Sequence, residues 1–250
     1  MTERKSPPSR EDVLDAAAAG VDLTRVAPEI DTWVFDLDNT LYHASHNLFD
    51  QVSDRIGQFI ARFLDVDRQE AHRLQKLYWH EHGTSLRGLM TLHQCRPEEF
   101  IEFVHDIDLS VIPPDPELDA ALARLPGRKV IFTNGSVPHA ERVMQRLGVA
   151  RHFDGVFDIV ACDYVPKPEQ AVYERLVGHF GFMPERAVML DDMAHNLKPA
   201  HALGMRTVWV RTDESLQRLQ ATGGDRSHIH HETDDVVRFL QQWPVKAASR

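Results

Sequence analysis

Two carboxylates follow a short apolar run in the stretch Trp33-Val34-Phe35-Asp36-Leu37-Asp38-Asn39-Thr40. In an extended chain successive side chains point to opposite sides, so Asp36 and Asp38 lie on the same side. Two like charges held this close need a cation or a shared proton to relieve their repulsion. The stretch therefore predicts a strand that leads into a metal-assisted phosphoryl-transfer site, with a solvated acidic turn as the plain alternative.

The chain beyond residue 130 alternates short β-branched runs with helical stretches, which is typical of βαβ units and a parallel sheet. Glycine follows three of the helical stretches, at Gly148, Gly181 and Gly204, where it suits the left-handed residue that ends a helix. We expect Thr233 to cap a last helix over residues 234–242. The candidate strands cover residues 33–37, 130–133, 156–160, 188–190 and 207–210, with a further strand-like piece near Ile229.

The pattern changes between residues 42 and 114, where apolar side chains recur at helical spacing without a strand-like run. We predict a helical cap domain over 42–114, inserted into an α/β core domain formed by 29–41 and 115–250, with 1–28 as a flexible N-terminal segment. The insert follows the two carboxylates directly, so it must rise beside them. The stiff run Pro113-Pro114-Asp115-Pro116 would return the chain to the core.

Three more polar signals lie at or near the carboxyl ends of predicted strands. Thr133-Asn134-Gly135 follows the second strand, Lys167-Pro168 opens a predicted helix, and Asp191-Asp192 follows the fourth strand. Taken singly, they have ordinary alternatives: a turn, a solvated lysine and a pair of helix caps. In an open parallel sheet, however, the carboxyl ends of the strands share one edge, so all of these signals can converge on one crevice.

The overall composition argues against several classes of protein. The charge of −10, from 28 basic and 38 acidic residues, repels nucleic acid backbones and anionic lipid, so no nucleic acid partner is expected. No apolar run is long enough to span a membrane, and the first residues lack a signal-peptide core. Cys95 and Cys162 lack the spacing of a metal knuckle. We expect a cytoplasmic protein without a membrane partner.

At these positions the chain resembles the haloacid dehalogenase-like superfamily of phosphotransferases. The match covers about residues 31–242, and the helical insert resembles the C1-type cap of that superfamily, on a Rossmann-like core. More narrowly, the chain resembles the pyrimidine 5′-nucleotidase branch of the superfamily. The segments that carry this resemblance are Thr40-Leu41-Tyr42, residues 82–89, Asp106-Ile107-Asp108-Leu109 and residues 125–135.

The resemblance implies a role for each signal. Asp36 would attack phosphorus and form an aspartyl-phosphate, and Asp38 would act first as general acid and then as general base. The Thr133 hydroxyl and the Asn134 backbone amide would hold the phosphoryl oxygens, while Lys167 would neutralise their charge.

A hard cation, most simply Mg²⁺, is implied by a ligand set made of oxygen atoms alone. Asp36, the backbone carbonyl of Asp38 and the pair Asp191 and Asp192 would hold it. We favour Asp192 as the direct ligand and Asp191 through water, with Asn196 supporting the ligands.

Selectivity is expected to come from the cap, because the motifs of the core contact only phosphate. Within the cap, Thr84 and Arg87 are candidates for reading a base or ribose, together with His46, His82 and Ser85. The plain alternative is that some of these residues are solvated or cap helices.

The predicted function is a Mg²⁺-dependent phosphatase of small phosphomonoesters, with pyrimidine nucleoside 5′-monophosphates (UMP and CMP) as substrates. A broad phosphatase or one for sugar phosphates, a phosphomutase and a catalytically silent binding module stay open as alternatives. The silent module is disfavoured because both acid motifs are complete. We expect a monomer or a homodimer, and no sequence feature supports a dimer through the cap.

Two further groups of polar residues are interpreted as structural. Asp106 and Asp108 repeat the spacing of the first motif, but they follow a helical stretch and precede the proline-rich linker, which favours a hinge or the edge of the cap over a metal site. The histidines at 228, 230 and 231 have no acidic or cysteine partner at metal spacing, so we expect solvated strand histidines.

Overall fold

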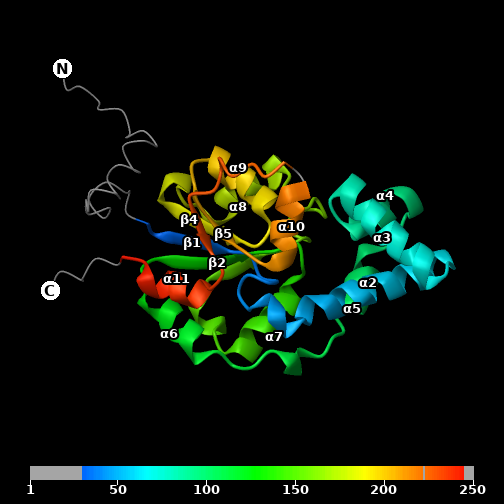
Figure 1. Cartoon of the computed structure of the whole chain (residues 1–250), viewed down its shortest axis with the longest axis horizontal. Coiled ribbons are helices and arrows are strands. Elements are labelled where there is room, and N and C mark those ends of the chain that lie inside the picture. The colour runs from blue at the N-terminus through cyan, green and yellow to red at the C-terminus, as the bar shows by residue number, and fades with distance from the viewer. Residues whose placement is uncertain (1–29, 222, 245–250) are drawn as a thin grey trace, which may run out of the picture.

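The computed structural model describes residues 30–221 and 223–244. The predicted N-terminal segment 1–28 lies outside the described residues. Six parallel strands form one sheet in the order β3-β2-β1-β4-β5-β6 (Figure 1). This confirms the predicted α/β class and places the strand of the first motif at the centre. The strands are β1 (Thr32–Phe35), β2 (Arg128–Phe132), β3 (Gly155–Phe157), β4 (Ala187–Asp191), β5 (Arg206–Val210) and β6 (His231–Thr233).

Helices cover both faces of the sheet because both faces of the central strand are apolar (Figure 1). Trp33 and Phe35 contact the layer formed by α6 (Pro116–Arg124), α7 (Val137–Leu147) and α11 (Val236–Gln242). Val34 lies in the second core, which is covered by α8 (Gln170–Phe180), α9 (Leu197–Ala202) and α10 (Asp213–Ala221). Within the described chain, short 3-10 turns connect these elements at Ala44–His46, Leu109–Val111, Ala150–His152, Pro184–Arg186 and Ala194–Asn196.

Three of the predicted strands end earlier in the structure than the sequence pattern indicated, β2 by one residue and β1 and β3 by more. β1 stops at Phe35 because the chain turns at once, with the Leu41 N–H donating to the Leu37 carbonyl at 2.9 Å. β3 stops at Phe157, and the Ile159 N–H instead donates to the Gly135 carbonyl at 3.1 Å. The acidic residues of the first motif therefore lie in the loop after β1.

The predicted helix ends at glycine are confirmed. Gly148, Gly181 and Gly204 have φ angles of 82°, 64° and 97°, in the left-handed region that closes a helix.

Two predicted helix starts are wrong. Asp235, and not Thr233, caps α11, because its carboxylate accepts from the Arg238 N–H at 2.9 Å. Thr233 ends β6, and its hydroxyl oxygen accepts from the Asp235 N–H at 3.1 Å. Likewise α8 begins at Gln170, so Lys167-Pro168 lies in the loop before that helix.

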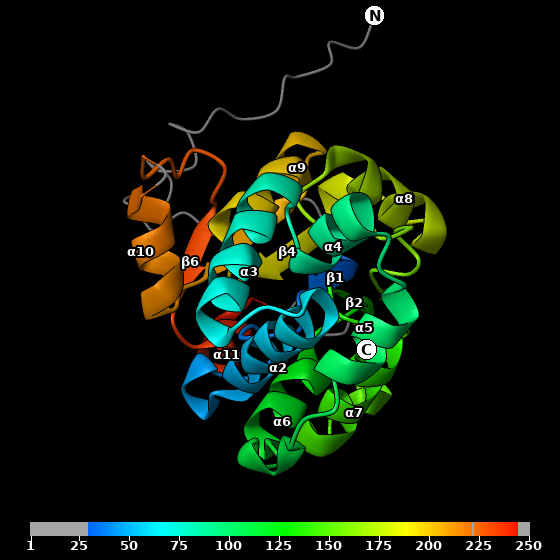
Figure 2. The same cartoon turned by 90° about the vertical axis from the view of Figure 1, so that its right-hand side faces the viewer.

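Of the helices between β1 and β2, the first four lie beyond the carboxyl ends of the strands (Figures 1 and 2). They are α2 (Leu48–Leu64), α3 (Arg68–His82), α4 (Ser85–His93) and α5 (Pro97–Val104), and we refer to them as the cap helices. They share an apolar cluster of their own, which includes Phe59, Ile60, Leu89 and Phe100. Their helical nature agrees with the sequence pattern, while the exact domain boundaries stay a prediction. Among the described helices, none is long and apolar enough to cross a membrane.

Candidate active site

A cavity of about 410 Å³ lies between the cap helices and the carboxyl ends of the strands. Its floor comes from the loops after β1, β2 and β4 and from the loop before α8. The structure thus brings the four sequence signals together, as the topology of a parallel sheet predicts. The floor residues include Asp36, Asp38, Thr133, Asn134, Lys167 and Asp192.

Lys167 lies at the centre of the floor, and its side chain is 1% exposed. Its Nζ donates to Asp36 Oδ1 at 2.8 Å, to Asp191 Oδ2 at 2.7 Å and to the Phe132 carbonyl at 2.9 Å, which uses all three ammonium protons. Burial alone would lower the pKa of Lys167, but the two carboxylates outweigh burial and raise it above its ordinary value. The lysine is therefore a fixed positive charge.

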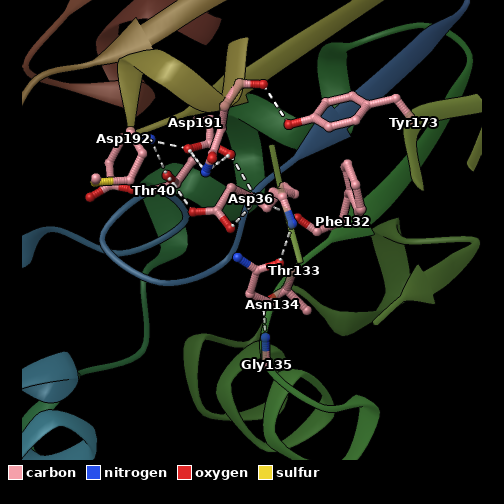
Figure 3. A network of polar contacts seen from close by, with 12 residues as sticks. Asp36, Thr40, Phe132, Thr133, Asn134, Gly135, Tyr173, Asp191 and Asp192 are labelled. Carbon is pink, nitrogen blue, oxygen red and sulfur yellow. Dashed lines mark hydrogen bonds and ion pairs between the residues drawn. The ribbon is translucent and has the colours of Figure 1, made fainter. Parts of the chain in front are cut away.

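Thr40 links the first motif to the last (Figure 3). Its hydroxyl donates to Asp36 Oδ2 at 3.0 Å, and its oxygen accepts from the Asp192 N–H at 3.0 Å. Together with Lys167, this contact holds both oxygens of Asp36. This role of Thr40 was not predicted, although its place four residues after Asp36 was a usable signal.

Asp36, Asp191 and Asp192 form a buried acidic cluster whose nearest oxygens lie within 4.8 Å of one another. Burial raises the pKa of Asp36 to about 7, despite the opposing effect of Lys167. Burial, Asp36 and Asp191 raise the pKa of Asp192 well above its ordinary value. One lysine does not balance three carboxylates, so the cluster is suited to a further cation.

The donor set of the cluster fits Mg²⁺, because it offers oxygen atoms only. Asp191 is fully engaged: Oδ1 accepts from the Met193 N–H and Asn196 Nδ2, and Oδ2 accepts from Lys167. By contrast, no donor within residues 30–221 and 223–244 reaches the Asp192 carboxylate. Asn196 Oδ1 is also buried without a partner in the described chain. A cation with its bound water would satisfy these oxygens.

The acidic cluster predicts that stability depends on pH and Mg²⁺. A pKa raised from 3.8 to about 7 means that the native state binds the Asp36 proton more tightly than the unfolded chain does. The stabilisation is complete below about pH 4 and is lost as the pH rises through about 7. Thermal unfolding in EDTA should therefore show a falling midpoint over this range. Mg²⁺ at about 100 times its Kd should add about 2.7 kcal/mol.

The Mg²⁺ effect should be larger at about pH 8 than at about pH 5, because the carboxylates are then ionised. The Asp192→Asn variant should lose most of it. An equal effect at both pH values, or an unchanged response in Asp192→Asn, would contradict the assignment of the site.

Asp38 lies beside the cluster and has different neighbours. Its Oδ1 accepts from the Tyr42 hydroxyl at 2.7 Å and from His139 Nε2 at 3.0 Å. Burial would raise the pKa of Asp38, but His139 and Tyr42 outweigh burial and lower it. His139 is 101 residues away and was not predicted. No local pattern identifies such a residue, because only the fold brings the start of α7 to the loop after β1 and so places His139 beside Asp38.

The second motif forms a tight turn at the floor of the cavity (Figure 3). The Thr133 hydroxyl oxygen accepts from the Gly135 N–H at 2.9 Å. Asn134 Oδ1 accepts from the Lys167 N–H at 2.8 Å, so the Asn134 side chain holds the lysine loop against the turn.

The cap residues named from the sequence are only partly at the cavity. Thr84 and Ser85 line it, although Thr84 also caps α4 by accepting from the Arg87 N–H at 3.1 Å. Arg87 is not among the lining residues; its guanidinium lies 3.4 Å from Glu169. His46 and His82 are not lining residues either. The helical turn explains this, because the side chain of Arg87 leaves α4 in another direction than that of Ser85. Lining residues that the sequence analysis missed include Trp79, His195 and Arg218.

The second Asp-x-Asp pair makes polar contacts, and its interpretation as a hinge or cap edge stays a prediction. Asp106 pairs with Arg55 at 3.0 Å, and Asp108 accepts from the Ser110 N–H at 2.8 Å. Neither belongs to a metal-ligating group found in the described chain.

The interpretation of the C-terminal histidines as solvated is wrong for His228. This side chain is buried, and its Nε2 lies 2.7 Å from the Ala194 carbonyl. His230 faces Thr207, with Nδ1 accepting from the Thr207 N–H at 3.1 Å. Both rings therefore fix the chain before β6 against neighbouring elements.

The fold and the position of these motifs define a class of protein. The haloacid dehalogenase-like hydrolase family matches residues 30–204, and the chain belongs to this family. Among curated proteins, it is similar to Phosphate metabolism protein 8 of Saccharomyces cerevisiae, with 29% identity over 236 residues, covering 87% of this chain and 73% of that protein.

Solved structures share the fold of this chain. A HAD phosphatase from Thermococcus onnurineus gives a TM-score of 0.56 at 18% identity, covering 85% of this chain and 97% of its own. CbbY from Rhodobacter sphaeroides, in complex with phosphate, gives a TM-score of 0.58 at 17% identity, covering 84% and 96%. At these identities the likeness is one of fold.

Proposed function

We propose that the protein is a Mg²⁺-dependent phosphomonoester hydrolase that acts through an aspartyl-phosphate and prefers pyrimidine nucleoside 5′-monophosphates. One observation carries the proposal of a phosphatase. Asp36 lies on the floor of a cavity with its carboxylate held by Lys167 and Thr40, and Asp38 follows two residues later on the same floor.

In the first step, an oxygen of Asp36 attacks phosphorus in line, and the bond from phosphorus to the ester oxygen breaks. The departing oxygen takes the proton that Asp38 carries in the enzyme–substrate complex, where the negative charge of the bound phosphate disfavours the ionised carboxylate. In the second step Asp38 accepts a proton from water, which attacks phosphorus and releases inorganic phosphate and the free Asp36 carboxylate. Asp38 thus returns to its starting state.

The phosphoryl oxygens would contact groups that are already in place. The Thr133 hydroxyl and the Asn134 backbone amide lie at the turn after β2, and Lys167 offers a fixed positive charge beside Asp36. Groups that do not reorganise during the reaction stabilise developing charge at least cost.

The acidic cluster would hold Mg²⁺ through Asp36, Asp191 and Asp192, with the backbone carbonyl of Asp38. When bound, the ion would supply positive charge that binds the phosphoryl group and neutralises the cluster. The free carboxylate of Asp192 supports this residue as the direct ligand, because Asp191 is already engaged by Lys167 and Asn196.

Support for a pyrimidine nucleotide comes from the branch-specific motifs and from the size of the cavity. About 410 Å³ suits a small organic phosphate. Thr84 and Ser85 offer hydroxyl groups from the cap, while Arg87 would reach the substrate only after leaving Glu169. A sugar phosphate is the second candidate, because a structure of a CbbY mutant, similar in fold, is in complex with xylulose-1,5-bisphosphate. A cytoplasmic location and a monomeric or homodimeric state stay predictions.

The test of substrate preference is phosphate release from UMP, CMP, AMP, GMP and several sugar phosphates, with Mg²⁺ and with EDTA. We expect UMP and CMP to be hydrolysed at least about tenfold faster than the purine nucleotides, because a size limit in the pocket is worth about 1–3 kcal/mol. Equal rates for all compounds would contradict the pyrimidine preference and keep the phosphatase. No release from any compound would favour a phosphomutase or a silent module.

A further inference from the structure

Two donors converge on one oxygen of Asp38. The Tyr42 hydroxyl and His139 Nε2 both reach Oδ1, at 2.7 Å and 3.0 Å. The other oxygen, Oδ2, receives no hydrogen bond from residues 30–221 or 223–244. Oδ2 lies 3.8 Å from the position that a Cβ on Gly135 would occupy, at the turn that borders the cavity floor. The Asp38 carboxylate is therefore held through Oδ1, while Oδ2 is available for proton transfer.

Within the described residues, the bond to Asp38 is the one hydrogen bond that the His139 ring makes. Its side chain is 0% exposed, although burying an imidazole is costly unless hydrogen bonds compensate for it. Its Nδ1 is buried without a partner in the described part of the chain, so Asp38 is the group that its ring bonds. A purely apolar ring would fill the same space, so the hydrogen bond to Asp38 is the property that requires histidine here.

The residue that follows the last cap helix packs on the His139 ring. His105, which follows α5, stacks on it with ring centroids 4.4 Å apart and an angle of 7° between the planes. His105 Nδ1 lies 3.0 Å from Ser136 Oγ, and the His105 carbonyl accepts from Arg142. These contacts attach the end of α5 to the first turns of α7, so the orientation of His139 depends on where the cap helix ends.

We propose that His139, together with Tyr42, is a positioning residue for Asp38: the two donors hold Oδ1 so that Oδ2 faces the ester oxygen of the substrate, and His105 seats the His139 ring. This inference rests on the proposed phosphatase function. Oδ2 gives its proton to the ester oxygen as the bond to phosphorus breaks, and it later takes a proton from the attacking water. His139 keeps its own proton throughout, and misplacing Oδ2 would slow both transfers.

The test compares two substrates in His139→Phe, which keeps a ring against His105 and removes the Nε2–H donor. One substrate is UMP, or the alkyl phosphomonoester that the wild type hydrolyses fastest, whose leaving oxygen needs a proton. The other is p-nitrophenyl phosphate, whose phenolate leaves without one. Release of the leaving group is measured in a single turnover. We expect a loss of about 100-fold with the alkyl ester and of less than about fivefold with p-nitrophenyl phosphate.

Two further variants separate positioning from simple structural support. His139→Gln places an amide Nε2–H where the ring donor was, so it should recover at least about tenfold of the lost rate, with KM for the alkyl ester nearly unchanged. The matched control is His152→Phe, because His152 Nε2 makes the same kind of bond to Asp119 at 2.7 Å and does not line the cavity. It should leave the rates with both substrates unchanged.

Equal losses with both substrates, with no recovery in His139→Gln, would overturn the inference and leave the phosphatase intact. A wild type that releases phosphate from neither compound would overturn the proposed function itself. If His139→Phe does not fold, Tyr42→Phe removes the other donor to Oδ1, and the same selective loss is expected from it.

Discussion

The Asp36→Asn variant is expected to lose phosphate release by about 10⁴-fold or more while remaining folded. An amide oxygen is a poor nucleophile, and the loss of a nucleophile removes the covalent route altogether. The measurement is phosphate release under saturating Mg²⁺ with the best substrate of the wild type. Labelled phosphate should also remain on the wild-type protein after acid quenching and be absent from the variant.

The unfolding midpoint of the Asp36→Asn variant shows whether its loss of activity comes from the missing nucleophile or from misfolding. Burial and the neighbouring acids raise the pKa of Asp36 to about 7, so at about pH 8 its ionised carboxylate lies unfavourably close to Asp191 and Asp192. The neutral side chain of the Asp36→Asn variant would remove this repulsion, so the unfolding midpoint in EDTA should be equal to that of the wild type or higher. The matched control, Asp119→Asn, alters an acid that does not line the cavity and should keep full activity. Retained activity in Asp36→Asn would refute the role of Asp36 as nucleophile.

The Lys167→Met variant is expected to lose both activity and stability. Methionine is unbranched like lysine and one atom shorter, and it leaves the carboxylates of Asp36 and Asp191 without their shared cation. Removing one partner of a buried ion pair typically costs about 3–5 kcal/mol. Chemical unfolding at about pH 8 in EDTA should show a loss of this order, and saturating Mg²⁺ should restore part of the stability because it neutralises the same acids.

The matched control is Lys129→Met, which alters a second buried lysine. Lys129 Nζ donates to the backbone carbonyls of Leu125 and Gly127, at 2.9 Å and 3.2 Å, and to no carboxylate within the described residues. Its loss should cost less stability, about 1–2 kcal/mol, and leave activity unchanged. If the two variants were equally destabilised and equally insensitive to Mg²⁺, the acidic cluster would not be the source of the effect.

The sheet and its motifs were predictable because they depend on short-range patterns. Strands β1, β2, β4 and β5 follow from compact β-branched or apolar runs, and the helix ends at Gly148 and Gly181 follow from the backbone freedom of glycine. The predicted start of the last helix was wrong because two polar side chains compete for the position of the helix cap. Asp235, and not Thr233, caps α11, because β6 already holds Thr233 in an extended conformation.

The residues of the candidate site likewise include some that were predictable from short-range patterns and some that were not. The predictable residues lie next to a strand or helix pattern in the sequence; they are Asp36, Asp38, Thr133, Lys167 and Asp192. A parallel sheet places such positions at one edge. Arg87 also looked suitable from the sequence, but the direction of its side chain depends on how α4 is rotated against the core. That rotation is set by packing and turns the guanidinium toward Glu169.

The sequence by itself determined the α/β class, the edge of the sheet where the candidate site lies and the identity of its acids, because strand periodicity and the rules of parallel sheets act locally. Only the tertiary structure decided which groups hold those acids. Lys167 bridges Asp36 to Asp191, and His139 reaches Asp38 across 101 residues. The physical reason is that burial makes every charge depend on its nearest partners, and those partners are chosen by packing between distant elements.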